Sequence, residues 1–315
     1  LYAQIVSAIC AGFIGGDAFA KPWWSNPVLK YSEDTDSPSA SDAHYMNKDE
    51  SDQYLLIGLT ANANNRPVHL YSIPALISAA SSNDVAPLVV GTSANLYNVW
   101  KGGAVSDDLK LALTGQASVG PHNSMSLIGP WVKGVNVFSI TNDPTAFSMD
   151  GIDFSHTSAY LFSNLYTAGY QNRIATWNVV DLLHGGIGLT TNTVFTTSLT
   201  RIRNVSSYYI GGKDLVYYGE GAASTATDCK VCVYDPSAPE GQKETVLVAG
   251  LPIGTIACDI MNVKVSGVGL GQMYLYVQSE KDSVYVYELN ADGKSVGKRV
   301  KTFSAAEISA LMGGE

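Results

Sequence analysis

Four polar residues lie at similar places in successive segments of the chain, and their side chains are of the kinds that bind a divalent cation. They are His122, Asp153, Asn204 and Asp259. Oxygen and nitrogen ligands that converge on one point can hold a cation such as calcium, which polarises a carbonyl group and activates water. Polar residues at such places can also line a water-filled central channel that holds no metal, so we keep both interpretations.

Two of the five histidines have the best positions for acid–base chemistry. His156 follows Asp153 by three residues, and His184 lies in the predicted loop 181–186. Histidine changes charge near neutral pH, which suits proton transfer. The sequence has no Gly-x-Ser-x-Gly, His-Glu-x-x-His or P-loop motif, so surface or loop histidines remain the alternative interpretation.

Aromatic and amide side chains in the predicted loops and hairpin ends suit carbohydrate binding. Aromatic faces stack on sugar rings, and amides bond to sugar hydroxyls. Packing inside the fold is the alternative use of the same rings. The segments 94–108 and 222–228 are predicted insertions, where a partner protein could bind. The candidate ligand-binding residues are Trp100, Trp131, Asn164, Tyr166, Tyr170 and Asn172.

The elements that would position these residues follow a repeated pattern. An apolar alternation closed by an aromatic and a small polar residue occurs five times, at 67–72, 135–139, 174–178, 231–235 and 284–288. Each copy follows a second apolar run, at 54–57, 126–128, 160–162, 215–218 and 273–276. The aromatic markers are 67, 39, 57 and 53 residues apart, which predicts five successive hairpins of one repeated unit.

Further β-prone stretches extend these hairpins to four strands. Outer stretches lie at 86–90, 193–197, 245–248 and 299–303, and inner ones at 151–154, 202–205 and 256–260. Four strands per unit at this period are typical of propeller blades, which must stack because one blade cannot bury both of its faces. We therefore predict an all-β fold, a β-propeller of four-stranded antiparallel blades. About six blades are expected, with five or seven as alternatives.

The ends of the chain are expected to complete a single domain. Residues 1–52 would contribute closing strands, with Val28–Tyr31 as one candidate and the acidic stretch 32–51 as a loop, and the blades would occupy 53–315. The segment Ser304–Glu307 has the pattern of a capping box and predicts a short C-terminal helix with Ile308 and Leu311 on one face.

Charge and composition exclude some partners. The formal net charge is −9, and the 19 basic residues are scattered, so we expect no nucleic-acid partner. No stretch approaches the about 18 apolar residues of a membrane-spanning helix. The tract 5–20 ends in the small-x-small pattern of signal cleavage, but Asp17 interrupts it and no basic residue precedes it. We interpret it as the start of the folded unit.

The four cysteines include one close pair, Cys229 and Cys232. This spacing occurs in metal knuckles and redox motifs, but residues three apart in a strand point to opposite faces. We therefore expect core packing, or a pairing between neighbouring blades that involves Cys258 or Cys10.

Three tracts carry a resemblance to known proteins. Residues 153–161, 172–178 and 273–293 resemble degenerate propellers of the lactonase-like and NHL-like groups. The last of these tracts contains the sequences Tyr-Leu-Tyr-Val and Val-Tyr-Val-Tyr-Glu-Leu-Asn-Ala-Asp-Gly. More narrowly, they are similar to secreted or lipid-anchored propeller proteins of gut-type Bacteroidetes bacteria. The resemblance covers roughly residues 53–303 at the level of blade pattern, and no invariant catalytic motif comes with it.

The resemblance implies an extracytoplasmic location and a link to glycan handling, but no activity, because propellers serve many functions. We predict a secreted, periplasmic or cell-surface binding or scaffold protein with a glycan or protein ligand on its loop face. The alternative is a metal-dependent lactonase-like hydrolase with ligands in the central channel.

Overall fold

A computed structural model describes fifteen stretches of the chain. The chain forms two compact units, Leu1–Pro144 and Thr145–Glu315. No helix within the described stretches is long and apolar enough to cross a membrane. The described residues are 43–48, 53–59, 68–78, 89–92, 100–106, 111–116, 123–128, 138–141, 151–165, 172–183, 193–220, 229–251, 262–278, 283–304 and 306–307.

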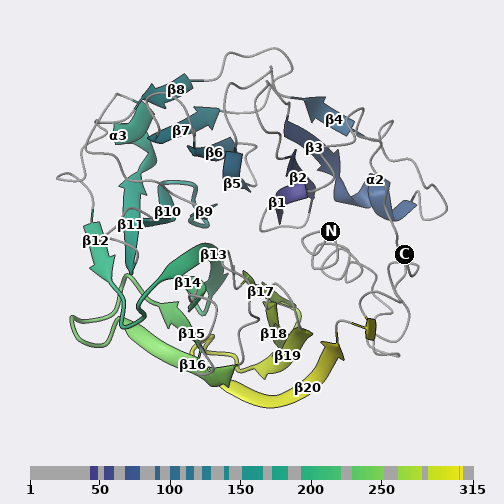
Figure 1. Cartoon of the computed structure of the whole chain (residues 1–315), viewed down its shortest axis with the longest axis vertical. Coiled ribbons are helices and arrows are strands. Elements are labelled where there is room, and N and C mark those ends of the chain that lie inside the picture. Colours follow the sequence, from purple (N-terminus) through teal and green to yellow (C-terminus); the bar gives the residue numbers. More distant parts are fainter. Residues whose placement is uncertain are drawn as a thin grey trace. The chain divides into compact units, whose positions relative to one another are not determined.

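The first unit contains two four-stranded antiparallel sheets in its described part, each in chain order (Figure 1). A short helix, α2 (Ile73–Ser78), follows the third strand of the first sheet. The first sheet consists of β1 (Ala43–Lys48), β2 (Tyr54–Leu59), β3 (Val68–Ser72) and β4 (Val89–Thr92). The second consists of β5 (Trp100–Val105), β6 (Leu111–Gln116), β7 (Asn123–Ile128) and β8 (Phe138–Thr141).

The second unit contains three such sheets among its described residues (Figure 1). Helix α3 (Val179–Leu183) follows β11. The first sheet has β9 (Ile152–Phe154), β10 (Tyr160–Leu165), β11 (Arg173–Asn178) and β12 (Thr193–Thr196). The second has β13 (Ile202–Ile210), β14 (Lys213–Glu220), β15 (Cys229–Tyr234) and β16 (Glu244–Leu251). The third has β17 (Asn262–Ser266), β18 (Met273–Gln278), β19 (Ser283–Leu289) and β20 (Val296–Ser304).

The predicted unit of four antiparallel strands is confirmed in these sheets, and each of the five predicted hairpins is formed by an antiparallel pair of strands. The hairpin at 126–128 and 135–139 joins β7 to β8, the third and fourth strands of its sheet, whereas the other four join the second strand to the third. The first two strands, β5 and β6, contain Gly102, Gly103 and Gly115. Because glycine is a weak strand former, the apolar alternation did not reveal these two strands.

One other predicted segment also differs from the structure. Strand β1 lies inside the stretch 32–51 that was predicted as a loop, since it pairs with β2 in register over most of its length. The first strand of the β17–β20 sheet lies at Asn262–Ser266, and the predicted inner strand at 256–260 lies outside the described residues. The remaining parts of 1–52, including Val28–Tyr31, lie outside the described residues. The number of blades stays a prediction.

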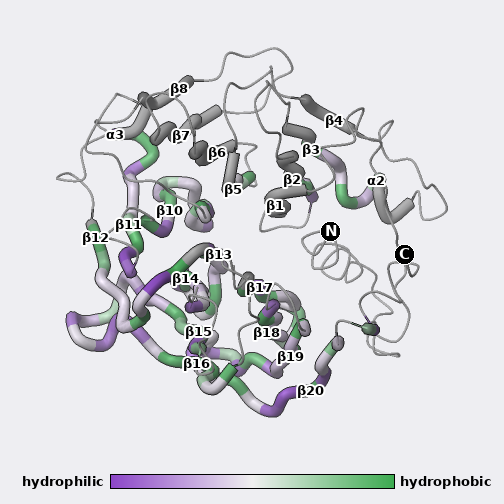
Figure 2. The backbone as a smooth tube through the Cα atoms, in the orientation of Figure 1, coloured by the Kyte–Doolittle hydropathy of each residue, from purple (hydrophilic) through white to green (hydrophobic). Residues whose placement is uncertain are grey.

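Alternation along the strands gives the middle sheet of the second unit two buried faces. Val216 and Tyr218 belong to a core cluster with Phe162 of the β9–β12 sheet. Leu215 and Tyr217 belong to another, with residues of the β17–β20 sheet such as Leu275. Figure 2 shows the strands of this unit alternating between hydrophobic and more polar segments. The period of two along β14 thus buries one set of side chains on each side.

The two described cysteines follow the same rule. Cys229 packs in the cluster shared with β17–β20 and Cys232 in the cluster shared with β9–β12, so their predicted opposite orientation is confirmed. Both are buried, and neither forms a disulfide bond. Core packing is therefore their role, whereas Cys10 and Cys258 lie outside the described residues.

We expect neither Cys229 nor Cys232 to react with iodoacetamide in the native protein. Burial, with the nearby carboxylates of Glu244 and Glu220, raises the pKa of Cys232 to about 12. The thiolate is the reactive form, so it is scarce at neutral pH. Peptide mapping by mass spectrometry, with urea-unfolded protein as the positive control, measures each site. Rapid native labelling of Cys232 would contradict the buried placement.

The capping box near the C-terminus is confirmed. The Ser304 N–H donates to Glu307 Oε2 at 2.8 Å, and the Glu307 N–H donates to Ser304 Oγ at 3.1 Å. Lys301 Nζ forms an ion pair with Glu307 Oε1 at 2.9 Å, at the end of β20. Ile308 and Leu311 lie outside the described residues, so the apolar face of the helix stays a prediction.

Candidate functional site

Asp153 was a candidate metal ligand, and the structure places it in a buried contact between two sheets. Its Oδ1 accepts the N–H of Phe154 at 3.0 Å, and its Oδ2 accepts the N–H of Ser207 on β13 at 2.8 Å. The carboxylate therefore joins β9 to the first strand of the next sheet. Both oxygens of the carboxylate thus accept backbone N–H groups of the fold.

Asn164 joins the same two sheets from near the C-terminal end of β10. Its Oδ1 accepts the N–H of Gly151 at 2.6 Å, and its amide nitrogen donates to the carbonyl of Ile202 at 3.1 Å. The residue is fully buried. Asn164 was predicted as a ligand contact at a hairpin end, but it lies inside a strand with its amide engaged by backbone groups of the fold.

Gly151 explains how β9 and β13 approach so closely. A Cβ atom built at Gly151 would lie 2.5 Å from Asn204 Oδ1 and 2.6 Å from Asn204 Cα. The Asn204 Oδ1 also accepts the N–H of Val205 at 2.8 Å. The structure thus brings Asp153 and Asn204 onto adjacent strands, as expected for inner strands of neighbouring blades.

The rest of the predicted metal set is not placed. His122 and Asp259 lie outside the described residues. Among the residues that are described, no three or more His, Cys, Asp or Glu side chains form a group that could hold a metal ion. A cation at this position stays a prediction.

We expect Asp153→Ala to reduce stability by about 2 kcal/mol, because it leaves the buried N–H of Ser207 without its acceptor. Asn164→Ala should cost at least as much, since it removes partners from Gly151 and Ile202. Urea denaturation measures both. Glu240→Ala is a suitable control, because Glu240 is exposed and its ion pair with Lys243 lies on the surface of the β15–β16 loop. Wild-type stability of Asp153→Ala would show that this hydrogen bond does not support the fold.

His156, a candidate acid–base residue, lies exposed in the turn between β9 and β10. Its backbone N–H donates to Asp214 Oδ1 at 2.8 Å. Its ring stacks on Tyr209, with ring centroids 4.2 Å apart and planes 12° from parallel. Tyr209 and Asp214 face each other across the β13–β14 hairpin. The turn of one sheet is therefore fixed onto the hairpin of the next.

Sequence reasoning missed Tyr209 and Asp214. The sequence did contain a pattern that predicts their hairpin, the Gly211-Gly212 pair. These two glycines form a two-residue hairpin turn with positive φ at both positions. Such a turn places the residues on its two sides opposite each other at the end of the sheet. That His156 would meet this hairpin depends on the packing of two sheets, which no local pattern encodes.

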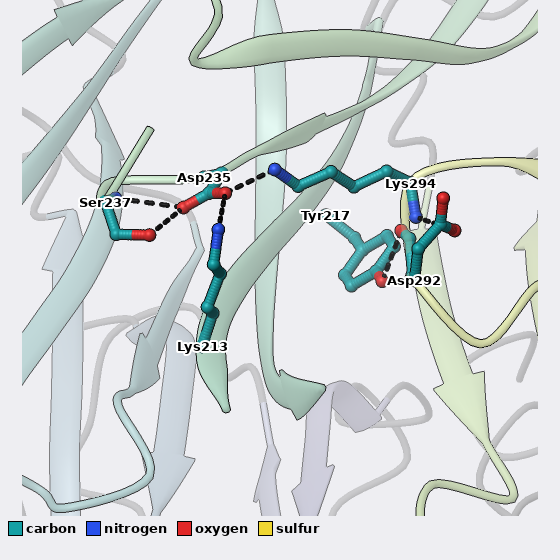
Figure 3. A network of polar contacts seen from close by, with 7 residues as sticks. Lys213, Tyr217, Asp235, Ser237, Asp292 and Lys294 are labelled. Atoms are coloured by element: carbon teal, nitrogen blue, oxygen red, sulfur yellow. Dashed lines mark hydrogen bonds and ion pairs between the residues drawn. The ribbon is translucent and has the colours of Figure 1, made fainter. Parts of the chain in front are cut away.

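The other side of the same hairpin is fixed by the β19–β20 turn (Figure 3). The Tyr217 hydroxyl donates to the carbonyl of Gly293 at 2.8 Å. Lys294 reaches back from this turn to the buried carboxylate of Asp235, which also binds Lys213 Nζ at 3.3 Å. The hairpin between β13 and β14 is thus held from both neighbouring sheets.

Asp235 is the charged centre of this contact. It accepts the N–H of Ser237 at 2.9 Å and the Ser237 hydroxyl at 2.6 Å, in addition to the two lysines. Burial raises the pKa of Asp235, but the hydrogen bonds from Lys294, Ser237 and Lys213 outweigh it and hold the pKa at about 2. Burial, with the charge of Asp292, raises the pKa of Tyr217 well above its usual range. Asp235 is therefore ionised and Tyr217 neutral at physiological pH.

The remaining candidates fall into two groups. Asn172 is half-buried before β11, and its carbonyl accepts the N–H of Thr197 at 2.9 Å and the Thr197 hydroxyl at 3.0 Å. Trp100 begins β5, the first strand of its sheet, and not the loop that was expected. The others lie outside the described residues, namely Trp131, Tyr166, Tyr170 and His184.

Comparisons with known proteins give similarities of fold. No family model matches the sequence, and no curated protein matches it. Among solved structures, the chain is similar to hydrazine synthase of Kuenenia stuttgartiensis, with 16% identity and a TM-score of 0.47, over 84% of this chain and 66% of that one. It is similar to the periplasmic gluconolactonase PpgL of Pseudomonas aeruginosa, with 12% identity and a TM-score of 0.49, over 85% of this chain and 73% of that one.

A third similar structure is the β-propeller domain of Cps50 (Swd1) from Myceliophteria thermophila. The identity is 8% and the TM-score 0.44, over 82% of this chain and 72% of that one. The chain spans just under two thirds of the hydrazine synthase chain. These identities are too low to transfer an activity from any of the three proteins.

Proposed function

We propose that this chain is a binding or scaffold protein of the β-propeller class, which works outside the cytoplasm and takes a carbohydrate ligand. One observation carries the proposal. Asp153, Asn164 and Asn204, polar residues that could have served chemistry or ligand contact, are hydrogen-bonded to backbone groups where the β9–β12 and β13–β16 sheets meet. These side chains build a rigid framework, and recognition is left to the turns that the framework presents.

A ligand panel tests this function. Soluble neutral and acidic polysaccharides are added one at a time, and the melting temperature is followed, because a ligand that binds only the native state raises it. We expect a rise with at least one polysaccharide and no release of shorter sugars during incubation. Degradation of the polysaccharide would show an enzyme, and no rise with any of them would contradict carbohydrate binding.

The alternative, a metal-dependent lactonase-like hydrolase, has one observation in its favour. Asp153 and Asn204 lie on adjacent strands of neighbouring sheets, where a third ligand could join them. Melting with EDTA, followed by addition of calcium, zinc, magnesium or manganese, decides this point. Under the binding proposal the melting temperature stays constant. A fall with EDTA that one cation restores would favour the hydrolase, with lactones as the substrates to assay.

A further inference from the structure

Three exposed aromatic residues lie in or next to the first turns of the β9–β12 and β13–β16 sheets. Tyr160 begins β10 directly after the β9–β10 turn and is 44% exposed. Tyr209 lies next to the end of β13 and is 37% exposed. The His156 ring, also exposed, is stacked on Tyr209. We call His156, Tyr160 and Tyr209 the turn surface.

The turn surface lies at one end of two neighbouring sheets. In a sheet whose strands alternate in direction, the first turn and the third lie at the same end. The backbone bond from His156 to Asp214 joins the first turn of one sheet to the first hairpin of the next. The close approach of Gly293 to Ile210 and Leu215 joins that hairpin to the third turn of the following sheet.

The stacked pair is held in place before any ligand arrives. On one side, Asp214 accepts the His156 N–H at 2.8 Å, which fixes the turn that carries the imidazole ring. On the other side, Tyr217 and Gly293 anchor the hairpin that carries Tyr209. Because both supports are already formed, binding would cost little ordering of these rings, and such pre-organisation favours affinity.

We propose that the turn surface binds a carbohydrate through ring stacking. The claim rests on the proposed function and assigns its ligand site to this end of the sheets. Each face of a sugar ring presents C–H groups that pack on an aromatic ring, while its edge carries hydroxyls. The turn surface carries both kinds of partner, because its three residues combine aromatic rings with polar atoms, and the Asp214 carboxylate beside it accepts the His156 N–H. Few apolar pockets recognise a sugar without such polar groups at their rim.

The competing occupant is a partner protein. Val180 of α3 and Leu270 of the β17–β18 turn are also exposed aliphatic residues near turns of this unit. Aliphatic side chains add area to protein interfaces but offer no stacking face to a sugar. The three aromatic residues with polar atoms favour the carbohydrate, and changes at Val180 and Leu270 make the protein alternative an outcome of the test.

The test uses affinity electrophoresis of the full chain in native gels that contain laminarin, xylan, galactomannan, polygalacturonate or chondroitin sulfate. Five variants are compared with the wild type: His156→Ala, Tyr209→Ala, Tyr209→Phe, Val180→Ala and Leu270→Ala. Val246→Ala is the matched control, because Val246 is 47% exposed on the outer strand β16, away from the stacked pair. Melting temperatures and circular dichroism show that each variant is folded.

For the polysaccharide that the wild type binds, we expect Kd to rise roughly tenfold or more in His156→Ala and Tyr209→Ala. Tyr209→Phe keeps the ring and should bind within about threefold of the wild type, and Val246→Ala should match the wild type. If Tyr209→Ala unfolds, the His156→Ala result decides. Unchanged binding in folded His156→Ala and Tyr209→Ala would overturn the site and leave the proposed function standing.

Two further outcomes are informative. Binding that depends on Val180 and Leu270 but not on the aromatic pair would overturn the stacking site in favour of an aliphatic contact surface. If the wild type is retarded by none of the five polysaccharides, both the site and the carbohydrate function are rejected.

Discussion

Replacement of Gly293 by alanine should lower the free energy of unfolding by about 3 kcal/mol or more. Gly293 has φ +67°, a conformation that costs a residue with a Cβ atom about 1 kcal/mol. The new Cβ would also lie 2.6 Å from Leu215 Cδ1 and 2.7 Å from Tyr217 Oη. Both side chains are fully buried, so neither can withdraw without disturbing the core between the β13–β16 and β17–β20 sheets.

Gly241→Ala separates the two contributions. Gly241 has φ +82°, but no atom lies within 4 Å of a Cβ built there. Gly241→Ala should therefore lower the free energy of unfolding only by the backbone contribution, about 1 kcal/mol. Urea denaturation of the two variants gives the comparison. Equal losses would mean that the β19–β20 turn does not pack tightly on the β13–β14 hairpin, and that the junction in Figure 3 is loose.

Tyr217→Phe tests the hydrogen bond in the same contact without changing the packing. It removes the donor to the Gly293 carbonyl and should cost about 1 kcal/mol, the ordinary net value of a hydrogen bond. The loss should be smaller than that of Gly293→Ala, because the ring stays in place. A larger loss would assign most of the stability of this junction to the hydrogen bond.

The strand pattern could be predicted because it is local. Alternation of apolar residues with a closing aromatic identified β10 with β11, β14 with β15 and β18 with β19, whose side chains fill the two core clusters. The same pattern failed at β5 and β6, where glycine and alanine replace branched residues. Local propensity therefore predicts a strand only where side chains supply most of its stability.

The roles of polar residues could not be predicted in the same way. Asp153 has one sequence context whether its carboxylate faces a cation or the backbone N–H of Ser207, 54 residues later in the chain. The choice is made by the register of β9 against β13, which depends on the absence of a side chain at Gly151. Asp235, predicted only as the polar end of a strand, likewise gained its partner Lys294 through the stacking of two sheets.

Asp235→Asn should lower the free energy of unfolding by about 2 to 3 kcal/mol at pH 7. The carboxylate is buried and neutralises two ammonium groups, those of Lys213 and Lys294. An amide of the same size keeps the shape and can still accept from Ser237, but it leaves the two lysines close together without a counter-charge. The lysines are partly exposed, so water relieves part of this cost and keeps the loss below that of a fully buried pair.

The pH dependence follows from the low pKa of Asp235. Its pKa is about 2 in the native protein, against about 3.9 in the unfolded chain. A carboxyl group with a depressed native pKa stabilises the fold fully above the unfolded value, and this stability is lost as the pH falls through the native value. The difference between wild type and Asp235→Asn should therefore be constant from pH 7 to about 5 and shrink between about pH 4 and 2.

Urea midpoints measured across this pH range check both parts of the prediction. Glu240→Gln serves as the control, because Glu240 is exposed and pairs with Lys243 at 3.1 Å only on the surface of the β15–β16 loop. Glu240→Gln should change the free energy of unfolding by no more than about 0.5 kcal/mol at every pH, as for other exposed ion pairs. If Asp235→Asn keeps wild-type stability at pH 7, the two lysines do not depend on this carboxylate. A difference that persists unchanged down to pH 2 would instead place the effect in packing and not in charge.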